Sequence, residues 1–355
     1  MPIVAHNSLP AFEKLRQDGQ TVLTLDRATH QDIRELHIGL LNLMPDSALR
    51  VTEQQFIRLV GSCNQIAQLF VHPFSVSGLP RSKNTQAYID KYYMDFEQIR
   101  QLGLDALIIT GANVQSPVLD QQIFWDPLNA VFNWALENVT SVLCSCLATH
   151  ALVKQLYDID RKLLKRKRWG VYNHYVVETK HPMLRDINTR FDVPHSRYND
   201  VTRKQLEAAG VSVLVENSDG EVHMAVSPDQ FRVVYLQGHP EYYTSSLLKE
   251  YKREVSRFYS NEIEDYPSHP DNYFDIEAMS IAENHQEKVR TAKNQGKSLP
   301  TFPEEQIQMY LHNTWRDTGK ALFNNWLGLI YQLTNVDRKL AFTPGVNPED
   351  PLGII

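Results

Sequence analysis

Short apolar runs, separated by segments of helical periodicity, make up most of the first 260 residues. The runs have the length of buried strands, and the segments between them space apolar residues three and four positions apart, as amphipathic helices do. This alternation predicts a mostly parallel sheet covered by helices on both faces. We expect strands over residues 36–43, 66–71, 105–110, 140–145, 211–215, 222–226 and 232–236, and helices over residues 51–60, 126–137, 147–157 and 244–258.

The pattern changes after residue 260. Residues 262–300 are polar and rich in Asn, Glu, Lys and Pro, so we expect a loop with one exposed helix over residues 278–294. Apolar residues at helical spacing return between residues 303 and 334, and a Pro-rich tail follows. We divide the chain into an N-terminal segment (1–35), a main α/β domain (36–260) and a C-terminal extension (261–355) with an insertion at about 277–311.

Composition narrows the class of protein. A net charge of −6 in 355 residues argues against binding to nucleic acid. Met1–Phe12 lacks the basic and apolar stretches of a signal peptide, and no apolar run is long enough to cross a membrane, so we expect a cytoplasmic protein. Cys63, Cys144 and Cys146 are too few for a disulfide framework, and the last two lie too close together for an ordinary metal pair.

A candidate nucleophile lies where the strand over residues 140–145 runs directly into a helix. Cys146 occupies that junction, which would place its thiol on a sharp turn at the carboxyl edge of the sheet. The helix dipole favours the thiolate there, and the backbone N–H of Leu147 can donate to an oxyanion. The competing interpretation is a buried structural cysteine, the role we assign to Cys144. Cys144 and Ala148 stand where such turns commonly have glycines.

A candidate base follows the strand over residues 232–236. That strand ends at Gly238, and His239 and Glu241 come directly after it. Such a histidine can act as a general base, and a carboxylate two residues later can fix its tautomer. Taken alone, the pair reads better as a turn histidine beside a surface glutamate. Together with Cys146 after an earlier strand, it resembles the class I glutamine amidotransferases, which implies their flavodoxin-like fold.

Six short segments follow one another along the chain: L-N-L-M-P at 41–45, T-G-A at 110–112, G-V-Y at 170–172, P-H-S-R-Y at 194–198, G-H-P-E-Y at 238–242 and N-N-W-L at 324–327. Together they resemble one family with that fold, the homoserine O-succinyltransferases. The resemblance covers residues 1–260 and resumes around 313–338. It implies that Cys146 takes an acyl group from acyl-CoA as a thioester, that His239 is the general base, and that Glu241 orients His239.

The resemblance also implies substrate contacts. Lys167, Ser196 and Arg253 match substrate-binding positions of the family, and Gly111 is a second backbone oxyanion donor. An arginine suits the α-carboxylate of homoserine, because its guanidinium binds a carboxylate through two hydrogen bonds. Without the family resemblance, we would interpret Lys167 as part of the solvated charge run at 161–168. Arg253 would be interpreted as an exposed helix residue.

Gln115 occupies the position that bears on the choice of acyl group. The family has glycine there with succinyl-CoA and glutamate with acetyl-CoA, since a carboxylate repels the free carboxylate of a succinyl group. Gln115 is neutral, which favours succinyl-CoA, but it is as bulky as glutamate, which leaves acetyl-CoA as the alternative donor. Asn113, where the family commonly has proline, is a second difference.

The implied reaction transfers a succinyl group from succinyl-CoA to the hydroxyl of L-homoserine by a ping-pong mechanism, at the start of methionine biosynthesis. It needs no metal and no bound cofactor, and the family implies a homodimer. Three alternatives stay open: serine as the acceptor, a hydrolase of the glutamine amidotransferase type, and a binding protein that has kept the fold.

Overall fold

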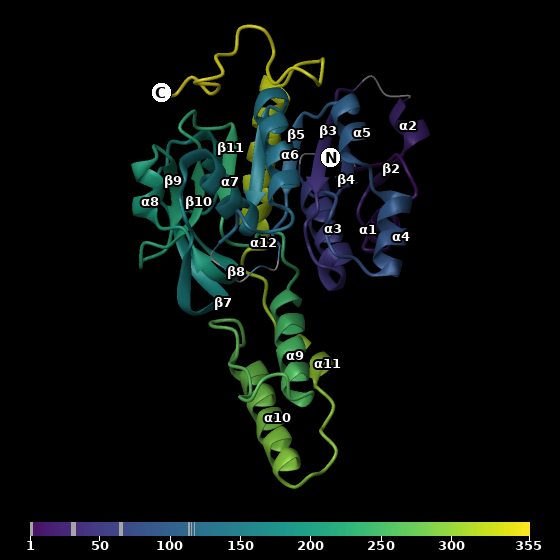
Figure 1. Ribbon diagram of the computed structural model, residues 1–355, viewed down its shortest axis with the longest axis vertical. Helices are drawn as coiled ribbons and strands as arrows, with labels where there is room; N and C mark the ends of the chain where they lie inside the picture. The colour runs from purple at the N-terminus through teal and green to yellow at the C-terminus, as the bar shows by residue number, and fades with distance from the viewer. Residues whose placement is uncertain (1–2, 30–32, 64–66, 113, 115, 117) are drawn as a thin grey trace.

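One large sheet organises the protein, as the computed structural model shows (Figure 1). Among the described residues, its 11 strands follow the order β2-β1-β4-β3-β5-β6-β11-β10-β9-β7-β8. The structure describes residues 3–29, 33–63, 67–112, 114, 116 and 118–355. The predicted α/β architecture with a mostly parallel sheet is confirmed.

The strands from β2 to β11 in this order run parallel. Their bounds are β1 (Ile3–Ala5), β2 (Val22–Thr24), β3 (Glu35–Leu41), β4 (Gln68–Phe74), β5 (Ala106–Ile109), β6 (Ser141–Ser145) and β11 (Val233–Leu236). β1 and β2 have no counterpart among the predicted strands, because runs this short carry no clear periodicity. The carboxyl ends of β3, β5, β6 and β11 meet at one edge, which brings together the residues that follow them.

The rest of the sheet is antiparallel. β10 (Val222–Val226) and β9 (Ser212–Glu216) match predicted strands, whereas β7 (Lys162–Val176) and β8 (Arg190–Asp200) do not. β7 contains most of the charge run, and most of its first five residues are exposed to solvent. The alternation of apolar and polar residues that signals a half-buried strand is therefore missing from it.

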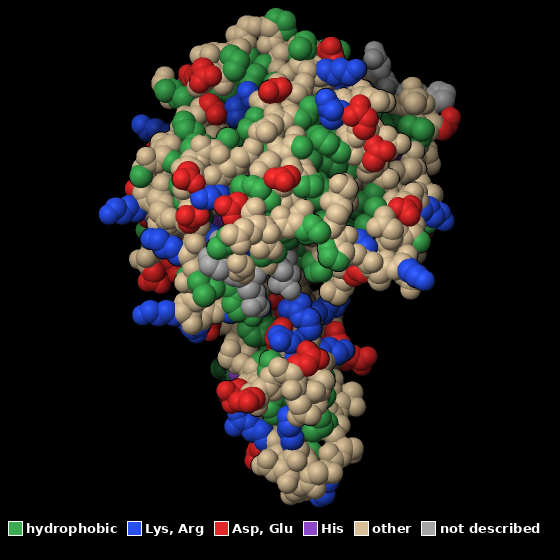
Figure 2. Space-filling model, in the orientation of Figure 1, with side chains coloured by type: hydrophobic (Ala, Val, Ile, Leu, Met, Phe, Trp, Pro, Cys, Tyr) green, Lys and Arg blue, Asp and Glu red, His purple; other side chains and the backbone are tan. Residues whose placement is uncertain are grey.

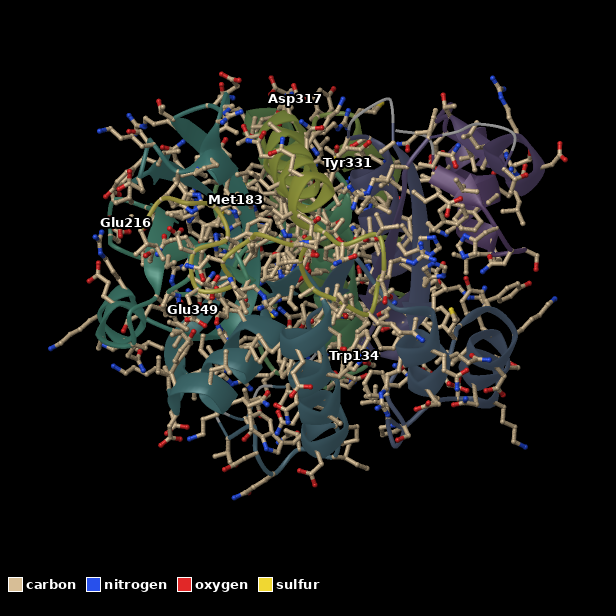
Figure 3. The ribbon with its side chains drawn as sticks, turned by 90° about the horizontal axis from the view of Figure 1, so that it is seen from above. Trp134, Met183, Glu216, Asp317, Tyr331 and Glu349 are labelled. Carbon is tan, nitrogen blue, oxygen red and sulfur yellow. The ribbon has the colours of Figure 1, made fainter. Side chains whose placement is uncertain are left out.

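Helices cover both faces of the sheet. In Figure 3, α12, with Asp317 and Tyr331, lies on one face, and α6, with Trp134, lies on the other. The first layer consists of α1 (Pro10–Gln17), α3 (Asp46–Gly61) and α12 (Arg316–Leu333), and the second of α5 (Phe96–Leu102), α6 (Trp125–Asn138) and α7 (Leu147–Tyr157). The body also contains α2 (Leu25–Thr29), α4 (Lys83–Tyr92), α8 (Arg203–Ala208) and a 3-10 turn at Pro182–Leu184.

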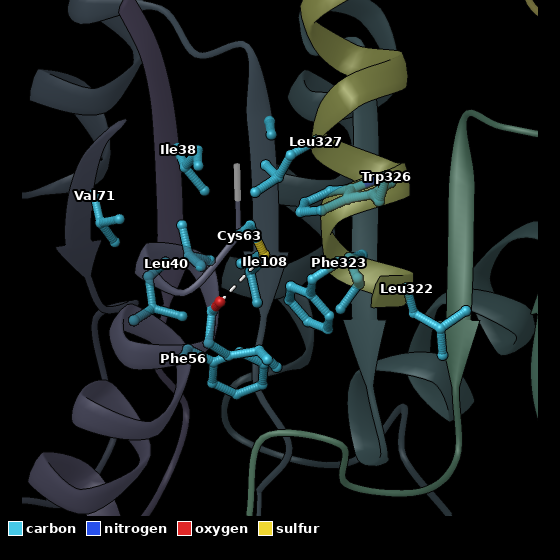
Figure 4. Packing of buried hydrophobic residues seen from close by; sticks show 14 of the residues in the cluster. Ile38, Leu40, Phe56, Cys63, Val71, Ile108, Leu322, Phe323, Trp326 and Leu327 are labelled. Carbon is cyan, nitrogen blue, oxygen red and sulfur yellow. Dashed lines mark hydrogen bonds between the residues drawn. The ribbon is translucent and has the colours of Figure 1, made fainter. Parts of the chain in front are cut away.

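Alternate residues of the parallel strands contact opposite layers. Ile38 and Ile108 face the first layer, where they belong to one cluster with Phe56, Phe323 and Trp326 (Figure 4). All five side chains are almost completely buried. Burying a side chain of this size stabilises a fold by about 1.5–3 kcal/mol, so the packing holds the sheet edge firmly in place.

A helical arm projects from the body at the bottom of Figure 1. It consists of α9 (Ser246–Tyr259), α10 (Ile276–Asn294) and α11 (Glu304–Gln308). α10 matches the predicted helix, but it is not simply exposed, because Ala278 and Val289 are buried in a cluster with Trp169 of β7. The polar composition conceals this packing, since a single apolar stripe is enough to bury one side of a helix.

The C-terminal extension contributes to both parts of the molecule. α12 packs onto the sheet, whereas α10 and α11 form the arm. The division of the chain at residue 260 and the homodimer stay predictions. Within the described ranges, none of the helices is long and apolar enough to span a lipid bilayer.

Gly170→Ala is expected to destabilise the protein by about 3 kcal/mol or more. Gly170 of β7 pairs with Asp271, before the arm helix α10, and has a φ of 151°. A Cβ at this position would lie 2.1 Å from the carbonyl oxygen of Asp271, so the backbone would have to move. Thermal unfolding measures the loss against Gly328→Ala, a control where a Cβ meets no atom within 4 Å. Equal melting temperatures of the two variants would contradict this close approach.

Candidate active site

Cys146 occupies a strained turn between β6 and α7. Its backbone angles are φ 53° and ψ −106°. Residues with a side chain seldom adopt such angles, which cost about 1–3 kcal/mol. The Cys146 N–H donates to the carbonyl of Leu236 in β11, at 2.7 Å, and so ties the turn to the neighbouring strand. The structure thus places Cys146 on the sharp turn that the sequence indicates.

His239 and Glu241 follow β11, the strand beside β6. Nδ1 of His239 lies 2.7 Å from Oε1 of Glu241, and both side chains are buried. The His239 backbone N–H donates to the carbonyl of Pro194 at 2.8 Å, and the Tyr242 ring stacks on the imidazole. Because Glu241 engages Nδ1, Nε2 is the ring nitrogen left to interact with the Cys146 thiol.

The charges around the thiol favour a thiolate–imidazolium pair. Burial lowers the pKa of His239, but the Glu241 carboxylate and the hydrogen bond with Cys146 outweigh it and raise that pKa to about 10. Burial raises the pKa of Cys146, but the hydrogen bond and charge of His239 bring it below the ordinary value. Burial alone acts on Cys144 and raises its pKa.

Two backbone amides flank the thiol. Leu147 is the first residue of α7, where N–H groups have no acceptor within the helix. A Cβ placed on Gly111, after β5, would lie 3.4 Å from the Cys146 Cβ and 3.7 Å from the Leu147 nitrogen, so the backbone of Gly111 lies beside Cys146 and the start of α7. This arrangement suits an oxyanion formed beside Cys146. The donor roles of Gly111 and Leu147 stay predictions.

A cavity of about 430 Å³ opens over Cys146. Its walls come from the body and from α9 of the arm. It brings together Cys146, Lys167, Ser196, His239 and Arg253, which the family resemblance assigns to one site. Glu241 lies behind His239 and lines a second cavity next to this one.

Glu250 of α9 belongs to this cavity and was missed by the sequence analysis. Its carboxylate accepts hydrogen bonds from the Ser196 hydroxyl at 2.6 Å, the Tyr242 hydroxyl at 2.9 Å and the Lys167 ammonium at 3.1 Å. Burial raises the pKa of Glu250, but the charge of Lys167 and these hydrogen bonds bring it below its ordinary value. The spacing of three residues from Arg253 puts both on one helix face, which is the signal that could have revealed it.

Arg253 and Gln115 are the remaining predicted site residues. The Arg253 side chain is 51% exposed and pairs with Glu254 at 3.2 Å. Gln115 lies outside the described residues, so its role stays a prediction. Elsewhere in the described chain, no group of three or more His, Cys, Asp or Glu side chains is arranged to hold a metal ion.

Iodoacetamide is expected to alkylate Cys146 selectively at pH 7. The thiolate is the reactive form of cysteine, and Cys146 is partly exposed with a lowered pKa. Cys63 and Cys144 are buried, and burial raises the pKa of Cys63 to about 12. Peptide mass mapping after brief labelling measures the selectivity, with urea-denatured protein as the control in which all three react. Equal labelling of Cys63 and Cys146 in the folded protein is the contrary result.

The fold and the site define the class of protein. A mostly parallel sheet that carries a cysteine on a sharp strand-to-helix turn, beside a His–Glu pair, is suited to acyl transfer through a cysteine thioester. The profile of the homoserine O-succinyltransferase family matches residues 2–336. The chain belongs to the homoserine O-succinyltransferase family and is an acyltransferase. The resemblance noted in the sequence is confirmed.

Individual relatives cover the whole chain. The homoserine O-succinyltransferase of Methylococcus capsulatus is 56% identical over 354 residues, with 100% of both chains covered. That of Thiothrix nivea is 57% identical and covers 100% of this chain and 98% of its own. Among solved structures, a glutamine amidotransferase from Thermotoga maritima is similar with a TM-score of 0.41 and 11% identity, over 85% of this chain and 99% of its own.

Proposed function

We propose that the protein transfers the succinyl group of succinyl-CoA to the hydroxyl of L-homoserine, the first committed step of methionine biosynthesis, through a thioester on Cys146. The observation that carries this proposal is the composition of one cavity. Cys146 and His239 share it with Glu250 and Arg253, which suit an amino-acid acceptor.

The first half-reaction loads Cys146. Its thiolate attacks the thioester carbonyl carbon of the donor, and the carbonyl electron pair moves to the oxygen, where the N–H groups of Leu147 and Gly111 stabilise the charge. Collapse of this intermediate breaks the bond to the sulfur of coenzyme A. The imidazolium of His239 gives its proton to the departing thiolate. The products are free coenzyme A, acylated Cys146 and neutral His239.

Acylation prepares His239 for its second role. The Cys146 thiolate helps to raise the pKa of His239 in the free enzyme, after the larger contribution of Glu241, and that charge disappears when the thioester forms. Neutral His239 then takes the proton of the acceptor hydroxyl as its oxygen attacks the thioester carbonyl. The bond to sulfur breaks, Cys146 leaves as a thiolate, and the ion pair with His239 is restored.

The acceptor site is built around one negative and one positive group. Glu250 and Arg253 lie one helical turn apart on α9 and line the same cavity. A zwitterionic amino acid complements them, with its ammonium at Glu250 and its carboxylate at the guanidinium of Arg253. Lys167 and Ser196 both donate to the Glu250 carboxylate and hold it in position.

The donor approaches where positive side chains gather. Figure 2 shows Lys and Arg side chains at the junction of body and arm, and Lys167, Arg253 and Arg257 line the cavity there. Their charge attracts the phosphates of coenzyme A. We place the enzyme in the cytoplasm, where its three cysteines stay reduced, and expect a homodimer.

Release of coenzyme A tests the proposal when homoserine is supplied with either succinyl-CoA or acetyl-CoA. We expect O-succinylhomoserine, identified by mass spectrometry, and transfer from acetyl-CoA at least about 10-fold slower. Serine in place of homoserine tests the alternative acceptor, and glutamine alone tests the hydrolase. Ammonia release from glutamine, or no succinyl transfer by the folded protein, would overturn the proposal.

A further inference from the structure

Arg161 lies immediately before β7 and is buried, with 6% of its surface exposed. Its Nη2 donates to the carbonyl oxygens of Val114, at 2.9 Å, and of Ser116. Both carbonyls belong to the loop that follows β5, and the first residues of that loop line the cavity over Cys146. Arg161 therefore holds the loop whose first residues form one wall of this cavity.

The charge of this guanidinium is not neutralised by a carboxylate. Arg168 and Arg197, which are also largely buried, pair with Glu221 and Asp200. Arg161 forms no ion pair with a described carboxylate, and its Nε, like those of Arg168 and Arg197, is buried without a hydrogen-bond partner. A buried cation loses its hydration, and an anion beside it compensates that loss.

A compensating charge for Arg161 comes from the nucleophile. Burial lowers the pKa of Arg161 to about 10, and the charge of Cys146 acts on it in the opposite direction, so the two groups lie within electrostatic reach. Acylation removes the thiolate charge of Cys146. The Arg161 cation then has no anionic partner among the described residues at the moment when an acyl chain occupies the site.

We propose that Arg161 determines the specificity for the acyl group by pairing with the terminal carboxylate of the succinyl chain. This inference rests on the proposed succinyl donor. The carboxylate carbon lies three carbon–carbon bonds beyond the thioester carbonyl, roughly 4 Å away, so it stays close to Cys146. The unpartnered Nε is a free donor for a charge-assisted hydrogen bond. An acetyl group carries no charge and gains nothing from Arg161.

Thioester formation on Cys146 with two donors of equal chain length tests this inference. The donors are succinyl-CoA and butyryl-CoA, in which a methyl group replaces the carboxylate. For Arg161→Gln we expect the second-order rate constant of Cys146 acylation to fall about 100-fold with succinyl-CoA. With butyryl-CoA it should fall less than about 3-fold. Arg161→Lys keeps the charge and is expected to retain part of the preference for succinyl-CoA.

Arg232→Gln is the matched control. Arg232 is a largely buried guanidinium that donates to the carbonyls of Leu136 and Val139, away from the residues that line the cavity, so neither donor should be affected. Melting temperatures of all variants compare their folding. If Arg161→Gln does not fold, Arg161→Lys provides the test.

An equal loss with both donors would mean that Arg161 only holds the loop, and would overturn the inference. An unchanged rate with succinyl-CoA would also overturn it. Wild-type protein that forms no succinyl thioester would instead overturn the proposed function.

Discussion

Cys146→Ala is expected to lower kcat/KM for succinyl transfer by at least about 10⁴-fold. The proposed route passes through a covalent thioester, and no other cysteine can replace the thiol, since Cys63 and Cys144 are buried. The same change should abolish the mass increase of one succinyl group that the wild-type protein shows when succinyl-CoA is added without an acceptor. Coenzyme A release and intact-protein mass spectrometry measure the two effects.

Cys144→Ala is the control for this experiment. Cys144 lies two residues away, inside β6. Its side chain is completely buried against the second helix layer. Its replacement should leave the mass increase in place and change kcat/KM by less than about 3-fold, at some cost in stability. An acylated Cys146→Ala protein would mean that the nucleophile is another residue.

His239→Asn is expected to lower kcat/KM by about 10²–10⁴-fold and to shift its pH dependence. In the wild-type enzyme, thioester formation is lost as the pH falls through the lowered pKa of Cys146, because the thiolate is protonated. Without His239, burial dominates and raises the pKa of Cys146, so the acid limb of the profile should move to higher pH. Acylation and iodoacetamide alkylation, each measured against pH, report the shift.

Glu241→Gln and His150→Asn separate this effect from a loss of packing. Glu241→Gln keeps the size of the side chain but removes the main charge that raises the pKa of His239. It should give an intermediate loss and a smaller shift. His150 is also buried, with Nε2 2.8 Å from Oε1 of Gln237, and its replacement should leave the acid limb in place. A Cys146 profile that does not move in His239→Asn would show that the two residues form no ion pair.

The sequence predicts the parallel part of the fold well. β5, α6 and α7 bury regular apolar patterns, and a regular pattern is visible without knowledge of tertiary contacts. β7 was not predicted, because its first residues are exposed and charged, and because Trp169 and Val171 pack in the cluster of the arm. The packing of α10 was missed for a similar reason, since its partners come from α9 and β7.

The same difference separates the site residues that the sequence predicts from those that it misses. Cys146 and His239 could be located because each follows a strand at the edge where parallel strands end. Glu250 and Arg161 were missed, because each lies among charged residues that look solvated, although its helical spacing from Arg253 is a signal for Glu250. Their burial depends on elements far away in the chain, Ser196 and Lys167 for Glu250 and the loop after β5 for Arg161.

α9 is shared between the active site and the arm. One side presents Glu250 and Arg253 to the cavity, while Tyr251 and Val255 pack in the cluster that holds the arm together. Such a satellite cluster opens at a lower free energy than the main core of a domain. Mild heating should therefore disable the acceptor site while the strand-to-helix turn at Cys146 survives. An enzyme in that state would accept one acyl group and keep it, so substrate alone would trap it as a dead-end covalent adduct.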